Sequence, residues 1–171
     1  MRAPAVPSLA CLALTAVAAC GGGGDFVVAS DFTGTYDVAI TNKQNGCAFE
    51  KWNVDETSRG IPIVVAQDAA AGLTGEVQGG AGVLLGLWLG TNRFTAGTVS
   101  GDLGTLTIHG TNVQKKLGCS YTLTAEASFR LTGNTIEGTM TYTAVTNKSP
   151  DCGALEGCKT VQALAGSRPP K

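Results

Sequence analysis

Few residues of this sequence have the types and spacing that catalysis needs. His109 is the only histidine, so any Ser–His–Asp triad would have to use it. Asp102 lies nearby in the sequence, but no Gly-x-Ser-x-Gly segment offers a nucleophile on a strand-to-helix turn. In the segment TLTIHG, Thr105 and Thr107 share a strand face with His109, so we expect the imidazole to face solvent. The sequence therefore predicts no catalytic triad.

Paired carboxylates are the second arrangement that could do chemistry, because two of them can hydrolyse a glycosidic bond. Carboxylates are common on solvent-facing strand positions, so the candidates carry little signal; they are Glu50, Glu76, Glu126 and Glu137. No phosphate-binding glycine motif stands in a strand-to-helix context. The sequence thus indicates no catalytic residue, no metal site and no cofactor, and an envelope hydrolase is the least favoured function.

The N-terminal residues have the three zones of an export signal. Residues 1–8 carry Arg2 and the amino terminus as their only positive charges, and Leu9–Ala19 is apolar and uncharged. That length matches the roughly 7–15 apolar residues of a signal peptide and is shorter than the ~20 that span a bilayer. The residues Val17-Ala18-Ala19 also fit an ordinary cleavage site. We therefore expect residues 1–19 to be a signal peptide.

The tetrapeptide Val17-Ala18-Ala19-Cys20 resembles the lipobox of bacterial lipoprotein precursors. The resemblance covers residues 1–20 and implies cleavage before Cys20, which then becomes diacylated. It implies a protein held in the cell envelope, with membrane contact through the lipid, and Gly21 in place of aspartate favours the outer membrane. The glycine-rich residues 20–30 would form a flexible tether. The alternative is a simple secretory signal in which Cys20 has no role.

Cysteine chemistry beyond residue 20 rests on Cys47, Cys119, Cys152 and Cys158. An even number in an exported chain predicts two disulfides, for which three pairings exist. We favour Cys152–Cys158, because they bracket the short segment GALEG, which leaves Cys47–Cys119; the other pairings would join Cys47 to the C-terminal loop. A four-cysteine zinc site is the alternative, but the sequence lacks a Cys-x2-Cys pair.

The elements that must position these residues show the period of strands. From Cys20 onward the chain has about 150 residues, enough for one domain, which we place at 31–171. Apolar and polar residues alternate in three segments, whose predicted inner positions are Phe32, Tyr36, Val38 and Ile40; Leu123, Ala125, Ala127, Phe129 and Leu131; and Ile136, Met140, Tyr142 and Ala144. No segment beyond residue 20 has a clear helical stripe. We predict an all-β fold, an antiparallel meander of about 8–10 strands that forms a barrel or a sandwich.

Two segments are apolar without alternation: GIPIVVAQ at 60–67 and GVLLGLWLG at 82–90. Such runs are typical of strands buried on both faces, and we predict central strands for both. An exposed flap that meets lipid or lines a ligand cavity is the alternative for the second.

Net charge and composition narrow the function. The formal net charge is −1 and the sequence contains no basic patch, so we expect no nucleic-acid partner. The mature region resembles small exported lipoproteins of unknown function. It is expected to be a lipid-anchored, non-catalytic envelope protein that binds a partner protein or has a structural role. The alternative is a β-barrel carrier of a small apolar ligand, as lipocalin-like folds are, with Leu85, Trp88 and Phe129 as candidate lining residues.

Overall fold

The computed structural model of the chain describes residues 29–171. The predicted signal peptide at 1–19, the lipidated Cys20 and all but the last two residues of the predicted tether at 20–30 lie outside this range. None of the helices within it is long and apolar enough to span a bilayer.

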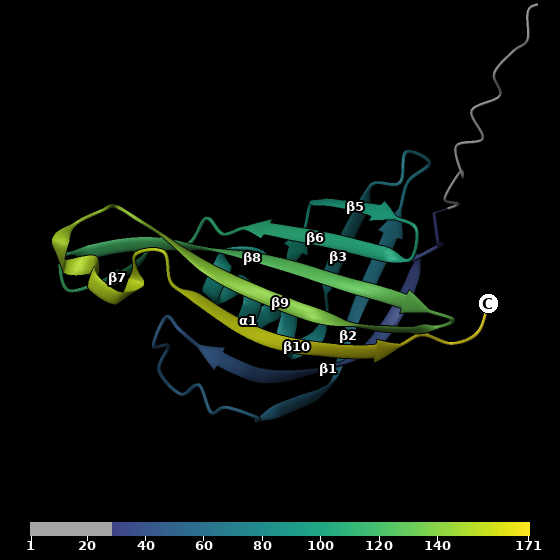
Figure 1. The fold of residues 1–171 in the computed structure, drawn as a ribbon, viewed down its shortest axis with the longest axis horizontal. Coiled ribbons are helices and arrows are strands. Elements are labelled where there is room, and N and C mark those ends of the chain that lie inside the picture. Colours follow the sequence, from purple (N-terminus) through teal and green to yellow (C-terminus); the bar gives the residue numbers. More distant parts are fainter. Residues whose placement is uncertain (1–28) are drawn as a thin grey trace, which may run out of the picture.

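Ten antiparallel strands form one sheet that curls into a nearly closed barrel (Figure 1). Nine of them follow the order β4-β3-β2-β1-β10-β9-β8-β6-β5, and β7 pairs with an extension of β8. The predicted all-β antiparallel fold is confirmed, and it is a barrel. In chain order the elements are β1 (Gly34–Asn45), β2 (Thr57–Gln67), β3 (Leu73–Val77), α1 (Gly79–Leu89), β4 (Arg93–Phe94), β5 (Ala96–Ser100), β6 (Leu103–His109), β7 (Gln114–Lys116), β8 (Cys119–Thr132), β9 (Thr135–Thr146), the 3-10 helix η1 (Pro150–Leu155) and β10 (Lys159–Ser167).

Closure of the barrel depends on contacts between segments that are distant in sequence. Strand β1 pairs with β2 on one side and with β10 on the other, so that Val38 lies between Ile61 and Gly166. The opposite seam is held by a short contact between β5 and the residues just before β3, where Val99 N–H donates to the carbonyl of Ala71 at 2.9 Å. Because few backbone bonds cross this seam, the barrel is only nearly closed.

The alternating segments face the interior as predicted. Leu123, Ala125, Ala127, Phe129 and Leu131 of β8 are buried, as are Ile136, Met140, Tyr142 and Ala144 of β9. Phe32, Tyr36 and Val38 are buried as well, and Ile40 is partly buried against the same core. Period two therefore identified the inner face of three segments correctly.

The prediction of a strand at 82–90 is wrong, because these residues belong to the helix α1. Leucine, alanine and tryptophan pack in either element, and the single β-branched residue, Val83, gives little preference for a strand. The helix ends at Gly90, whose backbone is left-handed with φ 87° and whose N–H donates to the carbonyl of Gly86. The helix shows no polar stripe, because one side faces the barrel interior while Val83, Leu84 and Leu87 are exposed.

The segment at 60–67 is a strand as predicted, but it is not buried on both faces. Ile61 and Val65 point inward and are buried, whereas Pro62 and Val64 lie on the outer surface and are only partly covered. The apolar outer side chains of β2 are therefore not a sign that both of its faces are buried.

One end of the barrel is closed by the residues that precede β1. Phe32 is fully buried, and its N–H donates to Oε1 of Gln67 at 2.8 Å. Its ring meets that of Phe129 edge to face, with centroids 5.6 Å apart. We call this the closed end.

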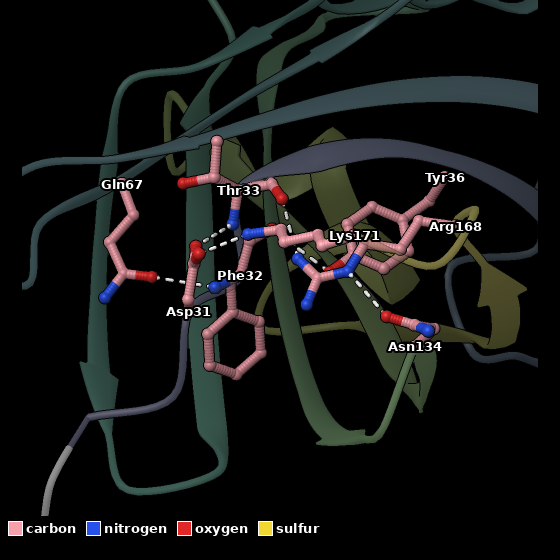
Figure 2. A network of polar contacts seen from close by, with 8 residues as sticks. All are labelled: Asp31, Phe32, Thr33, Tyr36, Gln67, Asn134, Arg168 and Lys171. Carbon is pink, nitrogen blue, oxygen red and sulfur yellow. Dashed lines mark hydrogen bonds and ion pairs between the residues drawn. The ribbon is translucent and has the colours of Figure 1, made fainter.

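Arg168, which directly follows β10, also stabilises the closed end, as Figure 2 shows. It is the only buried charged residue among residues 29–171. Its Nη1 donates to the carbonyl of Thr33 at 2.6 Å and its Nε to Oδ1 of Asn134 at 3.4 Å. The guanidinium also lies 5.4 Å from the ring centroid of Tyr36, where a cation–π contact is favourable. Burial raises the pKa of the Tyr36 phenol, so it stays neutral beside the cation.

The disulfide pairing favoured from the sequence is wrong. The bonds are Cys47–Cys158 and Cys119–Cys152, with Cα separations of 5.0 and 4.8 Å. The pairing of β1 with β10 places Asn45 opposite Thr160, which brings the next residue but one, Cys47, beside Cys158. Loop length alone suggested the local pair, but strand register decides the geometry.

The second disulfide follows from the pairing of β8 with β9. Cys119 begins β8 at the point where β9 ends, and η1, which follows β9, carries Cys152 back to it. The Cys47–Cys158 bond follows the end of β1 and the Cys119–Cys152 bond lies at the start of β8, beside β7, which is on the left in Figure 1. Arg168 follows the opposite end of β10. Two formed disulfides indicate an oxidising, extracytoplasmic location.

Candidate functional site

A cavity of about 890 Å³ occupies the barrel interior and opens at the end that carries the disulfides. Its volume lies within the roughly 300–1,000 Å³ that is usual for small-molecule sites. The opening, which we call the mouth, is bordered by the loop 46–56, by α1 and by β7. The fold thus encloses space rather than filling it with side chains.

The wall of the cavity is apolar along most of its depth. The inward residues of β1, β2, β6, β8 and β9 supply it, among them Val38, Val65, Leu106, Ala127, Phe129 and Met140. The three predicted lining residues, Leu85, Trp88 and Phe129, all lie on it. Leu85 and Trp88 reach it from α1 rather than from a strand, so the helix replaces part of the barrel wall.

Four aromatic rings, Phe49, Trp52, Trp88 and Tyr142, form a cluster just inside the mouth. Phe49 lies 5.1 Å from Trp88 and 6.2 Å from Trp52, and Tyr142 lies 5.1 Å from Trp88, between ring centroids. They come from the loop after β1, from α1 and from β9, so the aromatic cluster joins three separate elements. Both tryptophans of the chain are therefore part of the cavity wall.

A chain of hydrogen bonds leads from the aromatic cluster to the mouth loop. The Tyr142 hydroxyl donates to Oε1 of Gln162 at 3.0 Å, and Nε2 of Gln162 donates to Oδ1 of Asn42 at 2.8 Å. Nδ2 of Asn42 then donates to the carbonyl of Asn53 at 3.1 Å. Burial raises the pKa of Tyr142, so the phenol remains a neutral donor. The chain positions the loop 46–56 over the cavity.

The indole N–H of Trp52, in the same cluster, differs from these hydrogen-bonded groups. Within the described residues, its Nε1 is the one buried side-chain nitrogen or oxygen atom that has no hydrogen-bond partner. An unpaired buried donor costs about 1–3 kcal/mol. The packing of the aromatic cluster must offset this cost.

Positive charge surrounds the mouth. Lys51, Lys115 and Lys116 border the cavity with exposed side chains, and Glu50 is the only acidic residue among those that line it, although the loop 46–56 also carries Asp55, which pairs with Lys43, and Glu56. None of these lysines forms an ion pair within residues 29–171. The residues that line the cavity therefore carry an excess of positive charge, although the whole chain has a net charge of −1.

The residues considered for catalysis are not brought together. His109 is exposed at the end of β6, while Asp102 precedes the other end of that strand, roughly 20 Å away at 3.3 Å per residue, and pairs with Arg130. No group of three or more His, Cys, Asp or Glu side chains that could hold a metal ion is found in the part of the chain that the structure describes.

The four glutamates lie apart as well. Glu76 pairs with Arg93 at 3.2 Å, and Glu126 and Glu137 stand opposite Thr141 and Arg130 in the sheet. Glu50 lies alone at the mouth, so no carboxylate pair faces a common space.

Sequence reasoning missed the mouth. The loop residues Phe49 and Trp52, the buried Tyr142 as part of a polar chain, and the lysines of β7 were not singled out. One signal was available: aromatic residues are scarce, and two of them flank a short polar stretch, FEKW at 49–52. Only the closure of the sheet shows that Phe49 meets Trp88 and that Trp52 meets Tyr142.

Comparison with protein-family models, curated proteins and solved structures finds no match to this chain.

Proposed function

We propose that this protein binds a small ligand with a large apolar part inside its barrel. The observation that carries the proposal is the cavity of about 890 Å³, which is apolar in its depth and open at one end. Barrels of about eight strands either fill their interior with side chains or hold one small ligand. In this barrel Ala127 and other inward side chains leave the space unfilled, which supports a binding role in the manner of lipocalin-like carriers.

The proposal extends to location. The lipobox-like residues 17–20 support a bacterial envelope lipoprotein whose mature chain begins at Cys20. Gly21 after the cysteine favours the outer membrane as its location. Phe32 lies at the closed end, so a lipid on Cys20 would attach the barrel by that end. The mouth, at the opposite end, would remain free for a ligand.

Lipidation is tested by metabolic labelling with an alkyne fatty acid. Wild-type protein is expected to take up the label and the Cys20→Ser variant to lose it. Equal labelling of both would contradict the lipid anchor, without bearing on the cavity.

Ligand binding is tested by filling the cavity. Ala127 is buried on its wall, and a phenyl ring at this position projects into the space. Wild-type protein is expected to raise the fluorescence of the uncharged probe N-phenyl-1-naphthylamine, and the Ala127→Phe variant to abolish most of that increase. Native mass spectrometry of the protein from its own host would also show a retained small molecule.

The matched control is Ala66→Phe, the same exchange at an exposed position on the outside of β2. It is expected to bind the probe as the wild type does. Unchanged binding by the Ala127→Phe variant would contradict the proposal, because the probe would then lie outside the barrel.

A further inference from the structure

We infer that the ligand is an anionic amphiphile, with its apolar chain in the barrel and its negative head group at the mouth between Lys51, Lys115 and Lys116. This inference rests on the proposed function and adds the chemical class of the ligand. It follows from how polarity is distributed along the cavity.

Polar side chains line only one half of the cavity. Asn42 stands near the end of β1, Ser58 near the start of β2 and Gln162 near the start of β10, all on the side of the mouth. Toward the closed end the lining is aliphatic or aromatic, from Val65, Leu106, Phe129 and Ile136. A ligand that is polar throughout would lose its hydration there without replacement, whereas an apolar chain would lose nothing.

The charges at the mouth determine which sign of charge the head group should carry. Among the residues that line the cavity, three lysines against one glutamate favour a negative group, and no ion pair within residues 29–171 competes for these ammonium groups. Lys115 and Lys116 belong to β7, which the pairing of Lys116 with Cys119 fixes beside the Cys119–Cys152 disulfide. Their backbone is therefore held in place before a ligand arrives, which lowers the entropy cost of binding.

A cationic amphiphile is the main competing class, because the aromatic cluster could receive a quaternary ammonium group by cation–π contact. However, the cluster lies within the same opening as the three lysines, and a cation entering it would be repelled by them. Two of its rings, Trp88 and Tyr142, also contact each other at 5.1 Å, which leaves them packed against one another rather than spread around an empty cage. The charges thus favour the anion.

The experiment compares dodecanoate, dodecyl phosphate, dodecanol and dodecyltrimethylammonium, which share one chain length and differ in head group, each below its micelle concentration. Binding to the disulfide-bonded chain is followed by tryptophan fluorescence, because both tryptophans line the cavity. We expect an anion to bind at least about tenfold more tightly than the alcohol or the cation. Its affinity should fall as the salt concentration is raised. The two anionic probes distinguish a carboxylate head group from a phosphate.

The triple variant K51Q/K115Q/K116Q tests the lysines directly. Because each exposed charge pair contributes only a little and three are removed together, anion binding is expected to weaken by about tenfold while dodecanol binding is unchanged. The control R59Q/K148Q/K159Q removes the same charge at exposed positions that do not border the cavity and is expected to bind as the wild type does.

The outcomes separate the two proposals. If dodecanol or the cation binds as tightly as the anions, or if the triple variant binds them unchanged, the inferred head group is wrong and the cavity remains a binding site. If none of the four compounds changes the fluorescence, the proposed function itself is contradicted.

Discussion

At the scale of single residues, Arg168 makes the most consequential contacts at the closed end. Because its guanidinium is buried and bonded to the Thr33 carbonyl, the Arg168→Ala variant leaves that acceptor unpaired and removes the contact with Tyr36. We expect a loss of about 2–4 kcal/mol in the free energy of unfolding, measured by urea titration. The control Arg130→Ala breaks only the exposed pair with Asp102 and should cost less than about 1 kcal/mol. Equal losses in the two variants would contradict a special role for Arg168.

Asp31 gives a prediction that depends on pH. The hydrogen bond from Lys171, and next the N–H of Thr33, lower the pKa of the Asp31 carboxyl from 3.8 to about 2. A lowered pKa means that its contribution to stability is full above pH 3.8 and is lost as the pH falls toward 2. That contribution is small, because the side chain is 62% exposed.

We therefore expect the Lys171→Ala exchange to raise the pKa of Asp31 toward 3.8, with little change in stability at neutral pH. The Thr33 N–H remains and keeps the pKa below that value. NMR titration of the Asp31 carboxyl carbon measures this shift. An unchanged pKa would show that Lys171 does not contact Asp31 in solution.

At the scale of elements, α1 offers two glycines with opposite expectations. Gly86 lies in the middle of the helix, and a Cβ there would meet no atom within 4 Å. Gly90 has φ 87°, and a Cβ there would lie 2.4 Å from Oγ1 of Thr111. We expect Gly86→Ala to raise the free energy of unfolding by about 0.5–1 kcal/mol and Gly90→Ala to lower it by more than about 1 kcal/mol. Thermal unfolding measures both, and effects of the same sign would contradict the helix that ends at Gly90.

The disulfides cross-link the elements around the mouth. The chain-entropy model gives about 4.8 kcal/mol for Cys47–Cys158, which spans 111 residues, and about 3.7 kcal/mol for Cys119–Cys152, which spans 33. We expect the double serine variant at 47 and 158 to be the less stable of the two in urea unfolding. Peptide mapping under non-reducing conditions should recover these two bonds, and a peptide that joins Cys152 to Cys158 would contradict the pairing.

The elements also show how far the sequence could be interpreted. Alternation along β8 and β9 revealed the inner face, because each strand has one face in the barrel and one in solvent. The helix α1 was not predictable in this way, since a helix that borders a cavity on one side and is exposed and apolar on the other has no stripe. The Cys47–Cys158 bond depended on the β1–β10 register, which joins segments more than a hundred residues apart, and the Cys119–Cys152 bond on the pairing of β8 with β9.

For the whole molecule, the predicted all-β antiparallel fold was correct, and of the barrel and the sandwich that the sequence left open the chain forms the barrel. The site was only partly predictable. Leu85, Trp88 and Phe129 could be chosen as candidates because they are large and apolar in segments expected to pack inward, and all three line the cavity. The mouth was not predictable, because Lys51, Lys115 and Lys116 are ordinary surface residues until the chain closes around them. The cavity forms only when the sheet closes into a barrel, so no local sequence pattern reveals it.

The pairing of β1 with β10 determines when this protein can finish folding during synthesis. Strand β1 is complete at residue 45, but its second partner and Arg168 are made only at residues 159–168. At 5–20 residues per second, roughly 6–25 s separate the two events. During that interval one edge of β1 is unpaired and the apolar inner face of the sheet is exposed. Both favour aggregation. Closure of the barrel at β1 therefore waits for the last strand to become available.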